Sequence, residues 1–163
     1  MDDFRRRATL MVKGNRFEDF EPGRRFDHHW GRTVSESDNT LFTTLTLHYN
    51  PTYFNAEHAR SNGYDDVIVN PLLVFNMVFG LSVEDLSEGG GPFLGVDAMV
   101  HHAPVYVGDT LMASSVVVAG RLSEKRPGYG VVTWHTTGRN QRSEPVIEFR
   151  RTNLVRCREG ATP

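Results

Sequence analysis

The sequence predicts a single α+β domain in which a curved antiparallel sheet wraps one long central helix. The first observation is that residues 71–85 are apolar almost all round, as in a buried helix and unlike an amphipathic surface helix. The second is a run of β-like stretches, separated by turn signals, at 93–103, 105–122, 129–141 and 145–156. One helix followed by a run of long strands is an α+β order, and only the sheet can cover the helix.

Length and composition limit the class of protein. The 163 residues suit one domain, which we expect at 20–156, between an N-terminal extension at 1–19 and a C-terminal tail at 157–163. A net charge of -2 offers no general attraction for nucleic acid. The single cysteine, Cys157, excludes an internal disulfide and a cysteine-based metal site, so we expect a reducing cytoplasm. No stretch is apolar for long enough to be a signal peptide or to span a membrane.

The segment before the central helix predicts a strand and a helix. A short strand is expected at 25–34, and Ser35 with Asp38 offers a variant of the capping box for the helix that follows. The apolar face of that helix should consist of Leu41, Phe42, Leu45 and Leu47. Pro51 should end it, because proline lacks a backbone donor and disfavours helical geometry in the residue before it.

A polar and aromatic segment, 48–55, lies at this break between apolar helices. Asn55 can cap a short helix over 56–61, and Asn70 followed by proline is the expected start of the central helix. Side chains with acid–base chemistry at a break between apolar elements are typical of a pocket wall. We therefore expect residues 48–55 to contribute much of any active site.

The order of elements and several short motifs together resemble the MaoC-like dehydratase family. The motifs lie at 34–38, 50–51, 67–70 and 104–111. Within that family, 35–46 and 125–132 are most similar to the branch that acts on mesaconyl-CoA and related branched thioesters. The resemblance covers about residues 20–156 and implies the hot-dog fold, with the helix at about 71–85 wrapped by the sheet.

The resemblance also implies an activity. The family hydrates 2-enoyl-CoA thioesters reversibly, usually to the R-hydroxyacyl thioester, so an enoyl-CoA hydratase or dehydratase is expected. It implies an acyl-CoA substrate, no further cofactor, and pairing of sheet edges in a homodimer or a dimer-based assembly. The family's usual catalytic pattern is Asp-x-Asn-Pro-x-His. Laid on this chain, the pattern keeps Asn50 and Pro51, and it has His48 at the aspartate position and Tyr53 at the histidine position.

Hydration of an enoyl thioester needs a base for water, an acid for the α-carbon and donors that polarise the thioester carbonyl. His48 can serve as base or acid, because the unperturbed pKa of histidine, about 6.5, lies near working pH. Tyr53 can donate a hydrogen bond or a proton, and Asn50 can orient water or substrate through its amide. The amides near Asn70 and Leu72, at the positive end of the central helix, are candidates for binding the carbonyl oxygen.

Other interpretations of these residues stay open. His48 and Tyr53 could simply close hydrogen bonds at a helix break. The chain could also be a thioester-binding hot-dog subunit that supports an active partner, or a hot-dog thioesterase that uses Asp97.

Two further sets of residues invite a functional interpretation. The pairs His28-His29 and His101-His102 do not predict a metal site, because adjacent strand residues point to opposite faces. Either residue of the second pair is a reserve acid–base candidate. The candidate ligands for CoA phosphates, unless they simply face solvent, are Arg139, Arg150, Arg151 and Arg156.

Overall fold

The structure is a computed structural model that describes residues 14–158, so most of the expected N-terminal extension and C-terminal tail lies outside the described residues. Its centre is an antiparallel sheet with the strand order β1-β4-β5-β6-β3, and β2 pairs with β4 beside this path. The strands are β1 (Arg25–Asp27), β2 (Arg32–Thr33), β3 (Phe93–His101), β4 (Thr110–Leu122), β5 (Tyr129–Arg139) and β6 (Pro145–Arg156). The predicted α+β class is confirmed.

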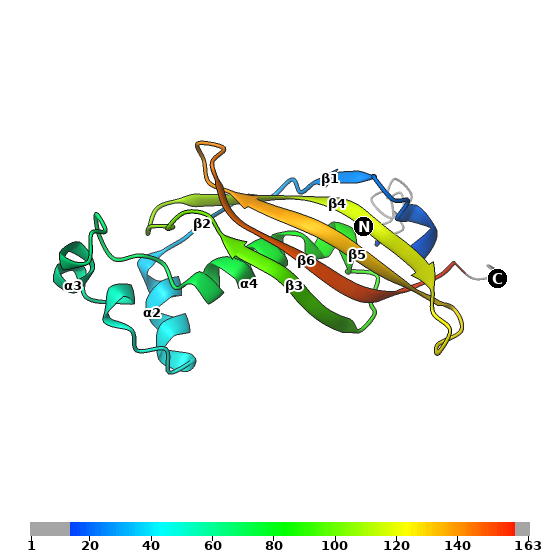
Figure 1. The fold of residues 1–163 in the computed structure, drawn as a ribbon, viewed down its shortest axis with the longest axis horizontal. Coiled ribbons are helices and arrows are strands. Elements are labelled where there is room, and N and C mark those ends of the chain that lie inside the picture. The colour runs from blue at the N-terminus through cyan, green and yellow to red at the C-terminus, as the bar shows by residue number, and fades with distance from the viewer. Residues whose placement is uncertain (1–13, 159–163) are drawn as a thin grey trace, which may run out of the picture.

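Helix α4 lies against one face of the sheet, whereas α2 and α3 lie together beyond one end of it (Figure 1). The helical segments are η1 (Phe17–Asp19), α2 (Glu36–Leu45), η2 (Pro51–Tyr53), α3 (Ala56–Ser61), α4 (Pro71–Leu81) and α5 (Val83–Leu86). Within residues 14–158, no helix has the length and apolar character needed to cross a membrane.

The main hydrophobic core lies between α4 and the sheet. The buried residues of α4 are Leu73, Val74, Met77 and Val78. They share one cluster with Val146, Ile147 and Phe149 of β6. Burying each such side chain stabilises the fold by about 1.5–3 kcal/mol. The helix comes close to β5 at Gly138, where an added Cβ would lie 2.6 Å from Val78 Cγ2, so a larger residue would push the helix away.

The central helix is shorter than the predicted 71–85. It ends at Leu81 and is followed by the separate turn α5. At the break, the Ser82 hydroxyl donates to the carbonyl of Phe79 (2.7 Å) and accepts from Nη1 of Arg151 (3.0 Å). A serine hydroxyl that bonds a helical carbonyl competes with the backbone ladder, and the arginine fixes that hydroxyl to the sheet. The predicted single helix is therefore two helical pieces.

Arg151 points into the core from β6, so the prediction that it could bind CoA phosphates is wrong. Its side chain is fully buried (0% exposed) between the rings of Phe79 and Trp134, whose centroids lie 4.4 and 5.2 Å from Cζ. Its Nη1 and Nη2 donate to the hydroxyls of Ser82 and Ser87, each at 3.0 Å. Burial lowers the pKa of Arg151 to about 10, so the guanidinium is still charged at neutral pH.

A second buried polar chain lies nearby and starts at His28. Its Nδ1 is 2.6 Å from Oδ2 of Asp85 and its Nε2 is 2.9 Å from Oγ of Ser115, which lies 2.8 Å from Oγ1 of Thr136. Burial lowers the pKa of His28 and outweighs Asp85, whose hydrogen bond and charge raise it. The ring is therefore neutral at pH 7, and Nδ1–H donates a hydrogen bond to Asp85 instead of forming an ion pair.

Of the apolar face predicted for the helix before the break, Phe42 packs, partly buried, against the main core, whereas the leucines are exposed. Leu41 and Leu45 are 61% and 72% exposed, whereas Asn39 and Thr43 are each 3% exposed. Positions 39 and 43 share one helix face, and their polar groups meet partners at the start of α4. The helix also ends before the proline predicted to stop it, since Leu47 has φ 56° and turns the chain away.

Two strand predictions differ from the structure. The strand expected at 25–34 is two short pieces, β1 and β2. The strand expected from residue 105 starts later, because 105–109 forms a turn in which Gly108 has φ +95° and Asp109 Oδ2 accepts from the N–H of Tyr106 (2.9 Å).

Packing extends a few residues beyond 20–156 at both ends. Phe17 packs, partly buried, on a second core cluster formed around Trp134. At the other end, the backbone N–H of Arg158 donates to both carboxylate oxygens of Glu18, at 3.2 and 3.1 Å.

Candidate active site

Asn39 ties α2 and the segment after it to the start of α4. Its Nδ2 donates to the carbonyls of Tyr53 (2.9 Å) and Ile68 (3.3 Å), and its Oδ1 accepts from the backbone N–H of Asn70 (2.8 Å). A buried amide that meets three backbone groups holds them at fixed distances from one another. The predicted site segment 48–55 is thereby fixed against the first turn of α4.

Asn70 is the cap of α4, as predicted, and it is fully buried (0% exposed). Its Oδ1 accepts from the backbone N–H of Leu72 (3.0 Å), which satisfies one of the free donors of the helix start. Its Nδ2 lies 3.0 Å from Nδ1 of His48 and 3.4 Å from Oγ1 of Thr43. The cap of the central helix therefore also holds the first of the predicted catalytic residues.

His48 and Tyr53 lie in contact at the break, while their catalytic roles stay predictions. Their rings form an edge-to-face pair with centroids 5.1 Å apart and an interplanar angle of 77°. Burial raises the pKa of Tyr53, and the neighbouring Tyr64 adds to the rise. The phenol of Tyr53 therefore stays protonated at neutral pH, which suits a donor and not a base.

The other predicted site residues are engaged within the chain. The side-chain oxygen of Asn50 accepts from the backbone N–H of Thr52 (3.1 Å) and caps η2, so Asn50 stands apart from the contact between His48 and Asn70. The backbone amides of Asn70 and Leu72, considered as donors to a substrate carbonyl, already donate to the side-chain oxygens of Asn39 and Asn70. The side chain of Leu72 is 45% exposed beside them.

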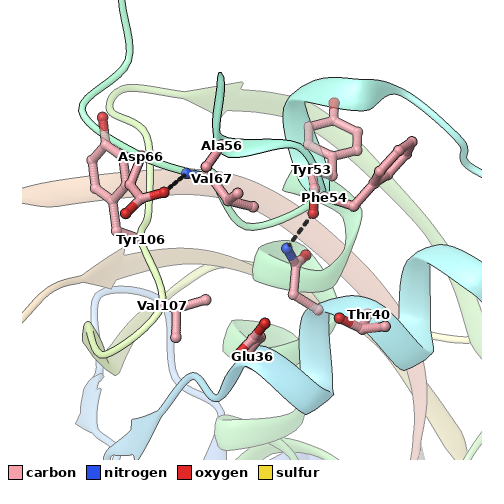
Figure 2. A pocket seen from close by; sticks show the side chains of 10 residues that line it. Glu36, Thr40, Tyr53, Phe54, Ala56, Asp66, Val67, Tyr106 and Val107 are labelled. Atoms are coloured by element: carbon pink, nitrogen blue, oxygen red, sulfur yellow. Dashed lines mark hydrogen bonds between the residues drawn. The ribbon is translucent and has the colours of Figure 1, made fainter. Parts of the chain in front are cut away.

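A cavity of about 480 Å³ opens next to Tyr53 (Figure 2). Glu36 and Thr40 reach it from α2, and Asp66 and Tyr106 reach it from two loops on the opposite side. Of the predicted site residues, Tyr53 lines this cavity, whereas His48, Asn50, Asn70 and Leu72 are not among its lining residues.

Sequence reasoning missed Glu36, Thr40, Asp66 and Tyr106 as parts of a cavity. They come from segments far apart in the chain, and none stands in a motif that carries chemistry. Glu36 belongs to the 34–38 motif of the resemblance, where the sequence assigns it no chemical role beyond following a helix cap. No local pattern relates it to Tyr53, because the folding of α2 against η2 brings them to one cavity.

The reserve candidates His101 and His102 line a different hollow, of about 260 Å³, beside Pro71 and Val74 of α4. Burial lowers the pKa of His101, and His102 adds to the decrease. Across residues 14–158, no group of three or more His, Cys, Asp or Glu side chains is placed to hold a metal ion.

The strand β3 presents an apolar surface at the edge of the sheet. Phe93, Leu94 and Val100 are 53%, 51% and 45% exposed. The unpaired backbone of an edge strand is a template for pairing with another chain. Near the start of α4, further exposed apolar side chains are Leu41, Leu45, Leu47, Tyr49, Phe54 and Leu72.

Comparison with known sequences gives one family. The profile of the mesaconyl-CoA hydratase family matches residues 2–162. A mesaconyl-CoA hydratase of Haloarcula hispanica is 39% identical over 156 residues, which are 95% of this chain and 44% of that protein. An (R)-specific enoyl-CoA hydratase of Rhodospirillum rubrum is 30% identical over 142 residues, which are 87% of this chain and 92% of that protein.

Solved structures agree with these relatives. A MaoC-domain dehydratase from Chloroflexus aurantiacus superposes with a TM-score of 0.89 at 35% identity, covering 96% of this chain and 44% of that chain. A Mycobacterium tuberculosis protein with a double hot-dog fold superposes with a TM-score of 0.85 at 22% identity, covering 94% and 48%. The predicted hot-dog fold is confirmed. The chain spans 44% of the length of the Haloarcula relative, which is less than half.

Proposed function

This chain belongs to the mesaconyl-CoA hydratase family, and we propose that it adds water to, or removes it from, the 2,3 double bond of an enoyl-CoA thioester. The observation that carries the proposal is the contact of His48 with Asn70 at the start of α4, beside Tyr53. An acyl-CoA is the proposed substrate, because the relatives in the family are named for mesaconyl-CoA and enoyl-CoA. The reaction class is a hydro-lyase.

The reaction divides into steps that these side chains can serve. A base removes a proton from water, the hydroxyl oxygen bonds to the β-carbon, and the electrons of the double bond move onto the thioester oxygen. A proton then adds to the α-carbon as the carbonyl reforms. In this proposal His48 acts at the thioester or on a proton, Tyr53 donates, and Asn50 orients substrate or water. Asn70, whose backbone amide and that of Leu72 already donate within the chain, takes part by holding His48.

A panel assay tests this function. Crotonyl-CoA and mesaconyl-CoA are incubated with the purified protein, and loss of the enoyl absorbance is followed. His48→Ala should lower kcat by about 10²–10⁴-fold, which is the range for a placed acid or base. His58→Ala, at an exposed histidine of α3, is the matched control and should keep the wild-type rate. Full hydratase activity in His48→Ala would contradict the assignment.

Glu36 is a further candidate for the base, because it lines the same cavity as Tyr53 and carries a carboxylate. Glu36→Gln keeps the shape of the side chain and removes its basicity. Its kcat on the active substrate of the panel should fall by about 10²-fold or more. Glu57→Gln on the exposed face of α3 is the matched control. An unchanged kcat in Glu36→Gln places the base elsewhere.

A second candidate function is a thioester-binding subunit that supports an active partner. It is favoured by the resemblance, in which both charge-handling positions of the usual pattern carry other residues, His48 and Tyr53. This function predicts no turnover on the panel, with binding of CoA esters retained in calorimetry. Release of free thiol from acyl-CoA would instead indicate a thioesterase.

The proposed assembly is a homodimer, or a homo-oligomer built from dimers, in the cytoplasm. The exposed apolar side chains of the edge strand β3 support it. Val100→Lys should weaken the dimer in native mass spectrometry, because lysine on an edge strand opposes pairing. Val118→Lys is the control, since Val118 is similarly exposed (43% against 45%) but lies on an inner strand. A monomeric wild-type protein would contradict the assembly.

A further inference from the structure

We infer that Asn70 is a positioning residue that keeps the single proton of the neutral His48 ring on Nε2. In that form His48 serves the reaction as a hydrogen-bond donor to the thioester oxygen, and the base that activates water is another group. This inference rests on the proposed function and specifies the role of His48 within it.

The start of α4 sets the orientation of the Asn70 amide. The backbone N–H of Leu72 needs an acceptor, and only the oxygen of the amide can provide one, at 3.0 Å. Proline at position 71 has no N–H, so this bond is the first that the cap can make. Because Asn70 is 0% exposed, a flipped amide would put NH₂ against the Leu72 N–H with no solvent to compensate. The helix start therefore decides which way the amide faces.

The orientation of the Asn70 amide determines the tautomer of the His48 ring. The amide nitrogen of Asn70 can only donate, and it lies 3.0 Å from Nδ1 of His48. Nδ1 must therefore present its lone pair, and the neutral ring carries its proton on Nε2. The hydroxyl of Thr43, 3.4 Å from the same amide nitrogen, is placed to accept the other amide hydrogen. The N-cap of α4 and the tautomer of His48 are thus one hydrogen-bonded unit.

This tautomer makes Nε2 of His48 a hydrogen-bond donor and not a base. Nε2 has no hydrogen-bond partner among residues 14–158, so its N–H is available to a ligand. To act as a base at Nε2 the ring would need its lone pair there, but the lone pair faces Asn70. A neutral imidazole N–H can instead polarise a carbonyl and stabilise the negative charge that develops on its oxygen.

The nitrogen chemical shifts of the His48 ring test the tautomer without any assay of activity. Protein labelled with ¹⁵N-histidine is measured across a pH titration, and the ring is assigned by its absence in His48→Gln. In the neutral ring we expect Nε2 to show the shift of a protonated nitrogen and Nδ1 that of an unprotonated one. A protonated Nδ1 in the neutral ring would overturn the inference.

Asn70→Asp reverses the hydrogen bond while it keeps the helix cap, since aspartate caps helices as well as asparagine does. Its carboxylate can accept from both the Leu72 N–H and Nδ1–H of His48, so the ring proton of the neutral form should move to Nδ1. We expect kcat to fall about 10²–10³-fold, the cost of losing one oxyanion donor, with KM nearly unchanged. Asn55→Asp, the same change at the cap of α3, should leave the His48 spectrum as in the wild type.

The outcomes separate the inference from the proposed function. A moved ring proton with wild-type kcat overturns the donor role of His48 while the hydratase function stands. An inactive wild-type protein with Nε2 protonated overturns the function, and with it the donor role, while the coupling of cap and tautomer stands. Thermal unfolding of Asn70→Asp close to that of the wild type shows that any loss of kcat is not a loss of the fold.

Discussion

Helix α4 has a buried polar network at each end, and the two networks differ in what they leave available. At the start of the helix, Asn39, Thr43 and Asn70 hold His48, whose Nε2 faces no partner in the described part of the chain. At the other end, Arg151 is enclosed by two aromatic rings and two serine hydroxyls. The first network reaches the cavity of about 480 Å³ through Asn39 and leaves the Nε2 of His48 without a partner in the described residues, whereas the groups around Arg151 bond only to one another.

Buried polar residues alone do not identify an active site. His28, Asp85 and Ser115 have the residue types and the hydrogen-bond order of a nucleophilic triad. Ser115, however, is only 1% exposed, and its hydroxyl is shared with Thr136 inside the sheet. A nucleophile must reach its substrate. This chain of hydrogen bonds therefore joins the residue after β1 to α5 and to the inner strands β4 and β5, and serves the fold.

The largest effect on stability is expected at Arg151. Arg151→Ala removes a buried side chain and leaves two serine hydroxyls without their partner, so the free energy of unfolding should fall by about 3–5 kcal/mol in urea titrations. Arg151→Met should cost much less, because it fills the space and removes a charge whose Nε has no partner. Arg150→Ala, on the exposed face of the same strand, is the control and should change stability by less than about 0.5 kcal/mol. Equal losses of stability in Arg150→Ala and Arg151→Ala would contradict the contrast between the exposed and the buried arginine.

Breaking the network at the start of α4 should lower the free energy of unfolding by less than Arg151→Ala does. Asn39→Ala leaves the N–H of Asn70 and the carbonyl of Tyr53 without the partner they have now, for a loss of about 1–3 kcal/mol in the same titrations. Expressed as free energy, the loss of activity on the enoyl-CoA panel should exceed the loss of stability. The reason is that segment 48–55 loses the hydrogen bond from Asn39 to the carbonyl of Tyr53. Asn62→Ala, at the exposed residue that follows α3, is the control. If Asn39→Ala kept full activity but lost stability, this network would serve the fold alone, as the network around Arg151 does.

The smallest effect concerns pH and His28. Burial lowers the pKa of His28 in the folded protein, so below about pH 6.5 the unfolded chain binds more protons than the folded one. Stability should therefore fall as the pH drops through this window, with a slope of at most about 1.4 kcal/mol per pH unit from this residue. Urea midpoints at about pH 7.5 and 5.5 should differ less in His28→Gln than in the wild type. The variant should keep a residual slope, because burial also lowers the pKa of His101.

The fold was predictable where the signal is local. Asn70 followed by proline marks the start of α4, and Asn55 with Gly63 marks the limits of α3, because caps and stops act on neighbouring residues. The inward face of α2 was not predictable from periodicity. Its buried positions are polar, Asn39 and Thr43, and their partners lie far along the chain.

The candidate site was predictable in part for the same reason. His48 and Tyr53 lie close in sequence, and the structure brings their rings to 5.1 Å, while their catalytic roles stay predictions. The contact of His48 with Asn70 depends on the packing of α2 against α4, which no local pattern encodes. The sequence alone does not show that Arg151 faces the core, because the side of a strand that faces the core depends on the partner strands and on α4.

The position of α4 in the chain has a consequence for biosynthesis. The apolar helix leaves the ribosome before β4, β5 and β6, the strands that cover it. β3 also emerges early, but its partner in the sheet is β6, so Phe93 cannot pair with Asn153 until β6 has been made. We expect the nascent chain to expose α4 until β6 is made, and to depend on chaperones in that interval. Protease sensitivity of nascent chains stalled at increasing lengths should therefore persist until the last strand has emerged.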